Sequence, residues 1–256
     1  MSLLFNGLTG GGGGGNYVDH GSGTSLDSLE SLTLIWWDYP NTVAGGNGRI
    51  IVKLNPGTNG FQVWSANINA GSARLFHLRT GTDGDVRMNT NTRQASSWNF
   101  NAISEASGSG NAYWGSLTAA VTDVTASAAA STGTEEDHSA QSLAIGGEAS
   151  QTSLDGRIAM LWLYNRVLTL AEIRMHQWMP TTILTGCVLK VNYFSTTTLQ
   201  DLSGNGNNGT ATNSPTGANH VPLGPAFGFD QQWFKVTAAA PGGSTYPGYY
   251  SAGGWF

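Results

Sequence analysis

The sequence predicts an all-β protein with antiparallel sheets, one short helix and an irregular C-terminal extension. Three observations support this. Short segments rich in β-branched and aromatic residues recur at short intervals, glycine or asparagine bounds most of them, and helical periodicity is nearly absent. Such spacing is typical of a sandwich or a barrel. The 256 residues are enough for one large all-β domain or two small ones.

The first half of the chain alternates between turns and short strands. The glycine run at residues 10–15 cannot support a strand interior, so it predicts a loop. Each segment that follows is apolar or aromatic and is bounded by turn residues. The predicted strands lie at residues 32–37, 49–54, 61–64, 73–79 and 85–90.

A single helix is specified at residues 170–178. Thr169 stands three residues before Glu172, which is the spacing of a capping box. Leu168 and Ile173 are placed to form a hydrophobic staple across the helix start. The helix is therefore predicted from local signals alone.

The strand before this helix, residues 156–164, is apolar on both alternating faces, so we expect it to be buried from both sides. Cys187 is the only cysteine, which excludes a disulfide framework and a thiolate metal cluster within the chain. It is expected to be a small buried core residue.

Composition excludes several classes of partner. Charged residues make up 11% of the chain, against about 25% in a typical soluble domain. The formal net charge is -5 and no cluster of lysine and arginine occurs, so nucleic acid is not an expected partner. No apolar run reaches the roughly 20 residues of a membrane span. The first residues lack the basic start and apolar core of a signal peptide, so we expect no classical secretion.

Candidate catalytic and metal-binding residues are few. Glu135, Glu136 and Asp137 lie in a Gly/Ser/Ala-rich loop, which favours a solvated charge patch. Asp83 and Asp85 lie near Gly81 and Gly84, which favours a hairpin turn over a calcium loop. We therefore expect no catalytic residue, no resident metal and no cofactor, with calcium as the one cation considered.

The histidines and tryptophans are also candidates for a site. No pair of histidines has metal-ligand spacing, so a zinc site is not predicted; the five are His20, His77, His138, His176 and His220. Aromatic rings are common sugar platforms, and at a strand period of two about half of the tryptophans should point into the core. The tryptophans in predicted strands or beside turns are Trp36, Trp37, Trp64, Trp98 and Trp114.

The order of the motifs resembles a known family. "SLAIGGEASQTSLDGRIAMLWLYNRVLTLAEIRMHQ" is similar to the end of laminin-G-like domains of the concanavalin A-like lectin and glucanase fold. "FNG…NYVDHGSGTSLDSLESLTLIWWDYP" resembles their opening, and "SSWNFNAISEASGSGNAYWGSLT" resembles their central strand and hairpin. The resemblance covers roughly residues 3–180. It implies a two-sheet antiparallel jelly-roll sandwich.

The resemblance also raises the question of chain order. A segment like "VLKVNYF…DLSGNGNNGT", at residues 188–210, usually stands at the start of such a domain, whereas here it follows the closing helix. It could complete its own sandwich as a circular permutation, since domain termini often lie close together. It could instead begin a truncated second unit, or add a strand to a neighbouring subunit. We expect a domain at residues 1–180, a completing segment at 181–234 and a tail at 235–256.

The tail is predicted to be an assembly element. It has no secondary-structure period and is rich in glycine, proline and aromatic residues, which suit interface anchors. The sandwich of the same chain is the competing receptor for these rings. The expected assembly contacts, including two residues just before the tail, are Trp233, Phe234, Tyr246, Tyr249, Tyr250, Trp255 and Phe256.

Two functions follow from these expectations. The first is a non-enzymatic structural protein of a virus particle, made in the host cytoplasm: a capsid decoration, minor capsid or fibre protein of a tailed phage with a lectin-like head. Its partners would be other virion proteins, copies of itself and a host surface glycan. The alternative is a carbohydrate-binding or adhesion module of a cell-surface protein. The carboxylate pattern Glu-x-Asp-x-x-Glu that the resemblance implies for enzymes of this fold is missing, so we predict no enzyme.

Overall fold

The structure is a computed structural model of the chain. It divides into two compact units, residues Met1–Val221 and Pro222–Phe256, which are described separately. The residues that the structure describes are 2–7, 15–27, 29–42, 48–55, 59–65, 73–78, 83–89, 92–106, 109–129, 132, 138–148, 152–179, 183–193, 199–218, 235–236 and 248–249.

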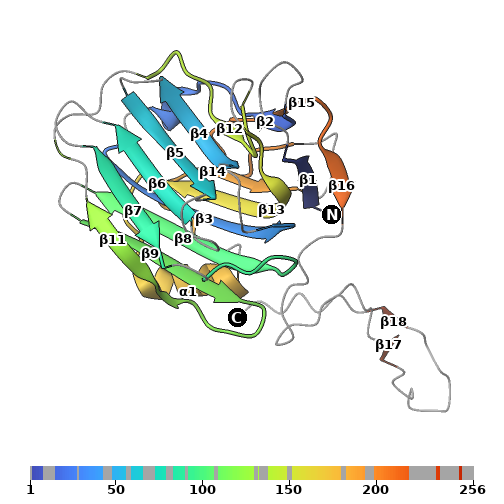
Figure 1. Ribbon diagram of the computed structural model, residues 1–256. Coiled ribbons are helices and arrows are strands. Elements are labelled where there is room, and N and C mark those ends of the chain that lie inside the picture. The colour runs from blue at the N-terminus through green and yellow to red at the C-terminus, as the bar shows by residue number, and fades with distance from the viewer. Residues whose placement is uncertain are drawn as a thin grey trace, which may run out of the picture. The chain divides into compact units, whose positions relative to one another are not determined.

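The first unit contains two eight-stranded sheets with antiparallel ladders (Figure 1), which confirms the predicted all-β sandwich. Sheet A has the strand order β10 (Thr122–Asp123), β9 (Ser109–Ser116), β8 (Asn99–Ala106), β3 (Ser31–Pro40), β13 (Asp155–Tyr164), β1 (Ser2–Asn6) and β16 (Thr216–Ala218), with β14 (Cys187–Asn192) also on β13. Sheet B has the order β11 (Thr125–Ala129), β7 (Gly84–Met88), β6 (Ala73–Leu78), β5 (Asn59–Ser65), β4 (Arg49–Asn55), β12 (Ala144–Ile145), β2 (Tyr17–Asp19) and β15 (Thr210–Thr212).

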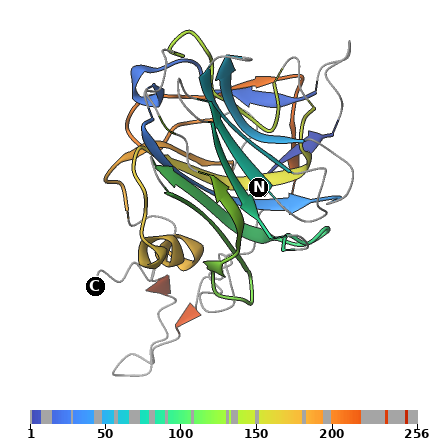
Figure 2. The ribbon, with the colours of Figure 1, turned by 60° about the vertical axis from the view of Figure 1, so that its left-hand side comes forward.

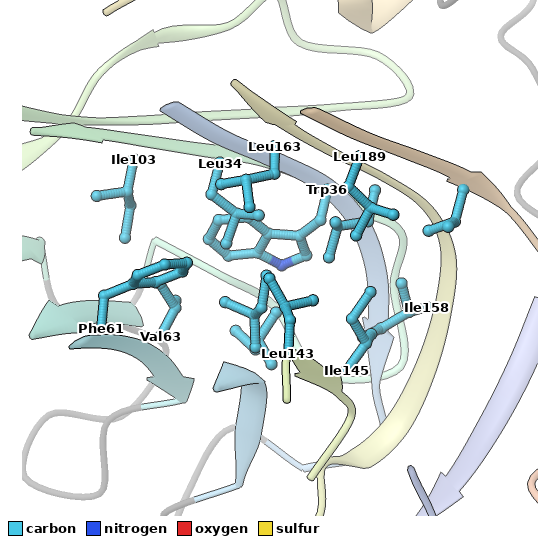
Figure 3. Packing of buried hydrophobic residues seen from close by; sticks show 14 of the residues in the cluster. Leu34, Trp36, Phe61, Val63, Ile103, Leu143, Ile145, Ile158, Leu163 and Leu189 are labelled. Carbon is cyan, nitrogen blue, oxygen red and sulfur yellow. The ribbon is translucent and has the colours of Figure 1, made fainter. Parts of the chain in front are cut away.

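The core between the sheets is built from their inward-facing apolar side chains. Trp36 of β3 is fully buried near its centre (Figure 3). Leu34 and Leu163 approach it from sheet A, and Phe61 and Val63 from sheet B. A buried aromatic side chain removes about 150–250 Å² from water, which at about 25 cal/mol per Å² contributes roughly 4–6 kcal/mol.

A second apolar cluster lies on the outer face of sheet A. It joins Trp37, Phe100 and Trp162 of that sheet to Ile173 of helix α1 (Leu170–Trp178). Figure 2 shows α1 on the side of sheet A that faces away from sheet B. Both faces of the central strands are therefore covered, as their continuous apolar sequence predicts.

Helix α1 begins where the capping box predicts. The Glu172 backbone N–H donates to Thr169 Oγ1 at 3.3 Å, and Thr169 N–H donates to Glu172 Oε2 at 2.8 Å. Gln177 fixes the other end, because its amide donates to the carbonyls of Ser116 and Ala119 and accepts from Val121 N–H. Among the described residues, no helix has the length and apolar character needed to cross a bilayer.

The segment after the helix returns to both sheets of the same chain. Strand β14 pairs with residues Met160 to Tyr164 of β13, and β1 pairs with the preceding part of the same edge, from Asp155 to Ile158. Strand β15 pairs with β2 of sheet B, and β16 pairs with β1 of sheet A. Cys187 lies buried in β14, and burial raises the pKa of its thiol to about 11.

The turn "DLSGNGNNGT" packs closely against this region. The Asp201 carboxylate accepts hydrogen bonds from Lys190 N–H, Ser203 N–H and Asn207 N–H at 2.8–3.1 Å. Gly204 has a positive φ of 92°, which a residue with a side chain rarely adopts. These three hydrogen bonds tie the turn to strand β14.

In the second unit, the structure describes one short strand pair. Lys235–Val236 (β17) pairs antiparallel with Gly248–Tyr249 (β18). The predicted assembly residues Trp233, Phe234, Tyr246, Tyr250, Trp255 and Phe256 lie outside the described residues, and for Tyr249 only the strand pairing is described.

Candidate functional site

The candidate site lies on the outer face of sheet B. In β5, Phe61 and Val63 point into the core, so the intervening Gln62 and Trp64 belong to the outer face. Trp64 is partly exposed there. This placement leaves part of an indole ring accessible at the centre of a sheet.

The Arg49 side chain stacks on this ring. A register irregularity between Arg49 and Ile51 brings Arg49 opposite Trp64, and its guanidinium carbon lies 4.3 Å from the ring centroid. Burial lowers the pKa of Arg49 to about 10, so it keeps its positive charge at neutral pH. The stack orients the indole and places a cation beside it.

Two strands farther along, β7 presents an acid and a base on the same outer face. Val86 and Met88 point into the core, so Asp85 and Arg87 point outward. Arg87 Nε lies 3.2 Å from both carboxylate oxygens of Asp85, and Nη2 lies 2.8 Å from Oδ2. The hydrogen bonds to Asp85 raise the pKa of Arg87, so Arg87 keeps its positive charge and its guanidinium is fixed in orientation.

This combination suits sugar chemistry. An apolar ring face packs against the C–H groups of a pyranose, while a carboxylate accepts from hydroxyl groups and a guanidinium donates to them. Trp64 and Arg87 lie in one row, because β6 pairs Arg74 with both of them. Two strand spacings separate them, which is about 10 Å.

The structure separates the candidate tryptophans into two groups. Trp36, Trp37 and Trp98 are buried, so they belong to the two cores. Trp64 and Trp114 are partly exposed. Trp114 Nε1 donates to Asn99 Oδ1 at 3.0 Å, so this ring is held against the neighbouring strand β8 of sheet A.

In the part of the chain that the structure describes, no three His, Cys, Asp or Glu side chains gather. Asp85 lies in β7 and pairs with Arg87, while Asp83 is exposed just before that strand. Glu135, Glu136 and Asp137 lie outside the described residues.

The four described histidines are buried, and sequence spacing did not indicate the contacts that His20, His77 and His176 make. His20 Nδ1 lies 2.7 Å from the Asn207 carbonyl, and His176 Nε2 lies 2.9 Å from the Tyr164 hydroxyl. The fourth, His138, is almost fully buried. His220 lies outside the described residues.

His77 belongs to one of two buried polar bridges between the sheets. His77 Nδ1 of β6 lies 2.8 Å from Glu105 Oε2 of β8, and both side chains have no exposed surface. Arg93 forms an ion pair with Asp38 of β3 and donates to Ser65 of β5 at 3.0 Å. These groups bridge the sheets inside the sandwich, out of reach of a large substrate.

Comparisons with known proteins agree with the fold. The family described as the concanavalin A-like lectin/glucanases superfamily matches residues 12–174. No curated protein sequence matches the chain.

A solved structure of a putative carbohydrate binding protein from Bacteroides ovatus is similar at 12% identity and a TM-score of 0.55. The alignment covers 85% of this chain and 61% of that one, so the chain spans about three fifths of that protein's length.

Weaker structural similarity extends to two further proteins. The SAP-like pentraxin of Limulus polyphemus has 11% identity and a TM-score of 0.46, with 68% of this chain and 80% of that chain covered. Tailspike protein 2 of an Escherichia coli O157:H7 bacteriophage has 12% identity and a TM-score of 0.47, with 75% and 26% covered. The family match spans more than half of the sequence, and the chain therefore belongs to the concanavalin A-like lectin/glucanases superfamily.

Proposed function

We propose that this chain is a non-enzymatic carbohydrate-binding protein whose sugar-binding face is the outer face of sheet B. The observation that carries the proposal is the partly exposed Trp64 ring, stacked by Arg49, in the same row as the Asp85–Arg87 pair. Such a face offers one apolar platform and oriented polar groups, which is the usual composition of a sugar site. The family to which the chain belongs includes lectins.

The absence of catalysis is part of the proposal. Glycoside hydrolysis needs two carboxyl groups, about 5–9 Å apart, on either side of the scissile bond. In strands β4 to β7, Asp85 is the only acidic residue, and it is bound to Arg87. A carboxylate held in this way is suited to accepting hydrogen bonds from the hydroxyl groups of a bound sugar rather than acting as an acid.

Glycan binding by the full chain tests the proposal, with Trp64→Ala as the diagnostic variant. Trp114→Ala is the matched control, because Trp114 is also partly exposed but lies in β9 of the other sheet, between β8 and β10. We expect the full chain to bind members of a glycan panel and Trp64→Ala to lose that binding, while Trp114→Ala keeps it. Equal binding by the two variants would place the site elsewhere, and release of reducing ends would contradict a non-enzymatic role.

We also propose a finer role: that this glycan-binding protein is a structural component of a virus particle, as a capsid decoration, minor capsid or fibre protein of a tailed phage. The observation that favours it is the aromatic sequence from Trp233 to Phe256, which suits contacts with other virion proteins or with copies of this chain. A cell-surface adhesion module is the competing assignment.

Deletion of residues 235–256 tests the virion role. We expect the shortened protein to lose its assembly while its melting temperature is unchanged. A much lower melting temperature with unchanged assembly would show instead that the tail belongs to its own core. Detection of the chain in purified virus particles would support the virion role, and detection on a cell envelope would support the adhesion module.

A further inference from the structure

A second arginine stacked on an aromatic ring lies on the outer face of sheet A. The register places Arg157 of β13 between Leu4 of β1 and Tyr39 of β3. The sequence neighbours of Leu4 and Arg157 pack into the core between the sheets, and Tyr39 packs against the outer cluster, so all three side chains belong to the outer face. Tyr39 also contacts Trp98, with the two ring centroids 5.5 Å apart. We call these four residues the Arg157 strip.

The Arg157 strip lies where the cover over the outer face of sheet A ends. In β13, every residue from Ile158 to Tyr164 is buried, whereas Arg157 is partly exposed. In β3, the residues from Leu32 to Asp38 are buried, whereas Tyr39 is partly exposed. Leu4 is partly exposed as well. A ligand can therefore reach the strip from solvent.

The Arg157 guanidinium is an unpaired positive charge. Its carbon lies 4.9 Å from the Tyr39 ring centroid, and its side chain makes no ion pair or hydrogen bond with the residues that the structure describes. Asp155 lies two residues away on the same face, but its carboxylate accepts from Asn41 Nδ2 at 2.9 Å and from the Thr42 hydroxyl at 3.4 Å. The Arg157 Nε atom is a buried donor without an acceptor. Buried donors of this kind are uncommon, and a bound ligand would supply the missing acceptor.

A buried acceptor without a partner lies on the same face. Val191 packs into the core, so the next residue, Asn192, points outward from the end of β14, opposite Met160. Asn192 Oδ1 is buried and accepts no hydrogen bond from the described residues. Three positions along β13 separate Met160 from Arg157, which is about 10 Å at most. A ligand with the size of one or two sugar rings can reach both side chains.

The state of the charges distinguishes this face from the outer face of sheet B. On sheet B, Glu148 interacts electrostatically with Arg49, and Asp85 forms hydrogen bonds with Arg87. Arg157 has no acidic partner in the part of the chain that the structure describes. An anionic group is therefore attracted more strongly to the Arg157 strip than to the Trp64 face.

We propose that the Arg157 strip is a second glycan-binding site, on the face opposite to the first, and that it binds the carboxylate of a sugar acid. This inference goes beyond the proposed function, which assigns only the outer face of sheet B. The carboxylate accepts two parallel hydrogen bonds from the guanidinium, and a hydroxyl group of the same ligand donates to Asn192 Oδ1. One chain would then bind two glycans on opposite sides and could join them.

The first test compares ligands that differ in charge. Trigalacturonate and its methyl ester serve for uronic acids, and sialyllactose and lactose serve for sialic acids. Calorimetry with the full chain should show at least one acid binding about tenfold or more tightly than its neutral counterpart, since a hydrogen bond to a charged group is worth roughly that factor or more. Raising the salt concentration should reduce the difference.

Variants then locate the acid on sheet A. Arg157→Gln should weaken binding of the acid by about tenfold to a hundredfold, whereas Trp64→Ala, which removes the first site, should leave it unchanged. Arg157→Lys keeps the charge but loses the planar fork, so it should retain only part of the affinity. Arg174→Gln is the control, because Arg174 is an exposed arginine on α1 whose Nε donates to the Val121 carbonyl. Circular dichroism of each variant would show that the fold is retained.

Other results overturn the inference. If the acid binds Arg157→Gln as tightly as the original protein, the strip is not its site. If Trp64→Ala abolishes binding of the acid, one site on sheet B serves all glycans, and the proposed function stands without a second site. If benzoate or inorganic phosphate competes as well as the sugar acid, the strip is a general anion site. If no acid binds while neutral glycans bind through Trp64, only the inference fails, whereas loss of the neutral binding alone would contradict only the proposed function.

Discussion

Strands β3 and β7 come from the two sheets and differ in what covers their outer sides. In β3, Leu34 and Trp36 pack into the core between the sheets, while Ile35 and Trp37 pack into the cluster beneath helix α1. In β7, only alternate residues are apolar, and its outward residues are the partly exposed Asp85 and Arg87. A strand covered on both sides needs apolar residues throughout, whereas a strand covered on one side can present polar groups.

This difference explains where a binding site can arise. Where helix α1 covers the outer face of sheet A, the aromatic side chains beneath it contribute stability. The outer face of sheet B keeps Trp64, Asp85 and Arg87 partly exposed. Aromatic side chains beneath helix α1 therefore contribute to the core, whereas the partly exposed Trp64 ring remains accessible to a ligand.

The largest effect is expected for Trp36→Ala in the core. Removing this fully buried ring leaves a cavity between the sheets and should lower the free energy of unfolding by about 3–5 kcal/mol. Urea unfolding followed by fluorescence or circular dichroism measures the loss. Trp114→Ala is the comparison, and equal losses for the two variants would contradict the assignment of Trp36 to the core.

The contact between α1 and sheet A should weaken in acid. Burial, and then the charge of Lys190, lower the pKa of His176 from 6.5 to about 4. Between these values the unfolded chain binds a proton that the folded chain does not, so stability should fall as the pH drops from 6.5 to 4, by up to about 3 kcal/mol.

Unfolding free energies between pH 4 and 7 test this expectation. His176→Gln should remove part of the pH dependence. Burial also lowers the pKa of His20, so that residue adds a slope of the same sign to both proteins, and it cancels in the difference. If the unfolding free energies of the original protein and of His176→Gln change with pH in parallel, His176 is not the group responsible.

A smaller effect is expected at the helix start. Hydrogen bonds from Arg166, and then from Thr169, lower the pKa of Glu172 from 4.5 to about 2. Because the folded value is depressed, this stabilisation is present above pH 4.5 and is lost as the pH falls toward 2. Glu172→Gln should cost about 0.5–1 kcal/mol at pH 7, since the pair is partly exposed. The unfolding free energies of the original protein and of Glu172→Gln should become equal near pH 2. A difference that persists at pH 2 would show that Glu172 stabilises the helix through packing instead.

A change in stability smaller than that of Trp36→Ala is expected for Trp64→Ala. Its ring is partly exposed and its stacking with the nearly buried Arg49 contributes about 2 kcal/mol, so the melting curve should shift less than for Trp36→Ala. The same variant should lose glycan binding. A stability loss comparable to that of Trp36→Ala would mean that sheet B is covered on both faces, which would remove the contrast between the sheets.

Local signals predicted the elements well. The capping box of Thr169 and Glu172 placed α1 at the residues where it occurs, and the strand segments at 49–54 and 73–79 match β4 and β6 within one residue. A helix cap depends on a hydrogen bond between residues three apart, and a strand depends on the alternation of apolar and polar residues, so both can be read from neighbours in the sequence. Of the site, the sequence supplied Trp64 among five candidate tryptophans, and it supplied Asp85 as a turn residue.

The remaining features depended on contacts between distant residues. His77 and Glu105 are 28 residues apart, and Asp38 and Arg93 are 55 apart, so no spacing rule connects them. The alignment of Arg49, Trp64 and Arg87 in one row results from the register of strands β4 to β7, and the irregularity at Arg49 decides which residue lies opposite Trp64. A shift of one residue would turn these side chains to the other face.

The sequence by itself determined the strands, the helix with its cap, and the tight turn after β14, because steric and hydrogen-bonding preferences act over a few residues. It also determined the family, through the order of these elements. Only the tertiary structure decided that β1 and β14 share one edge of β13, and that Trp36 is buried while Trp64 is partly exposed. Burial is a property of two surfaces in contact, and it is set only when the sheets and the helix pack together.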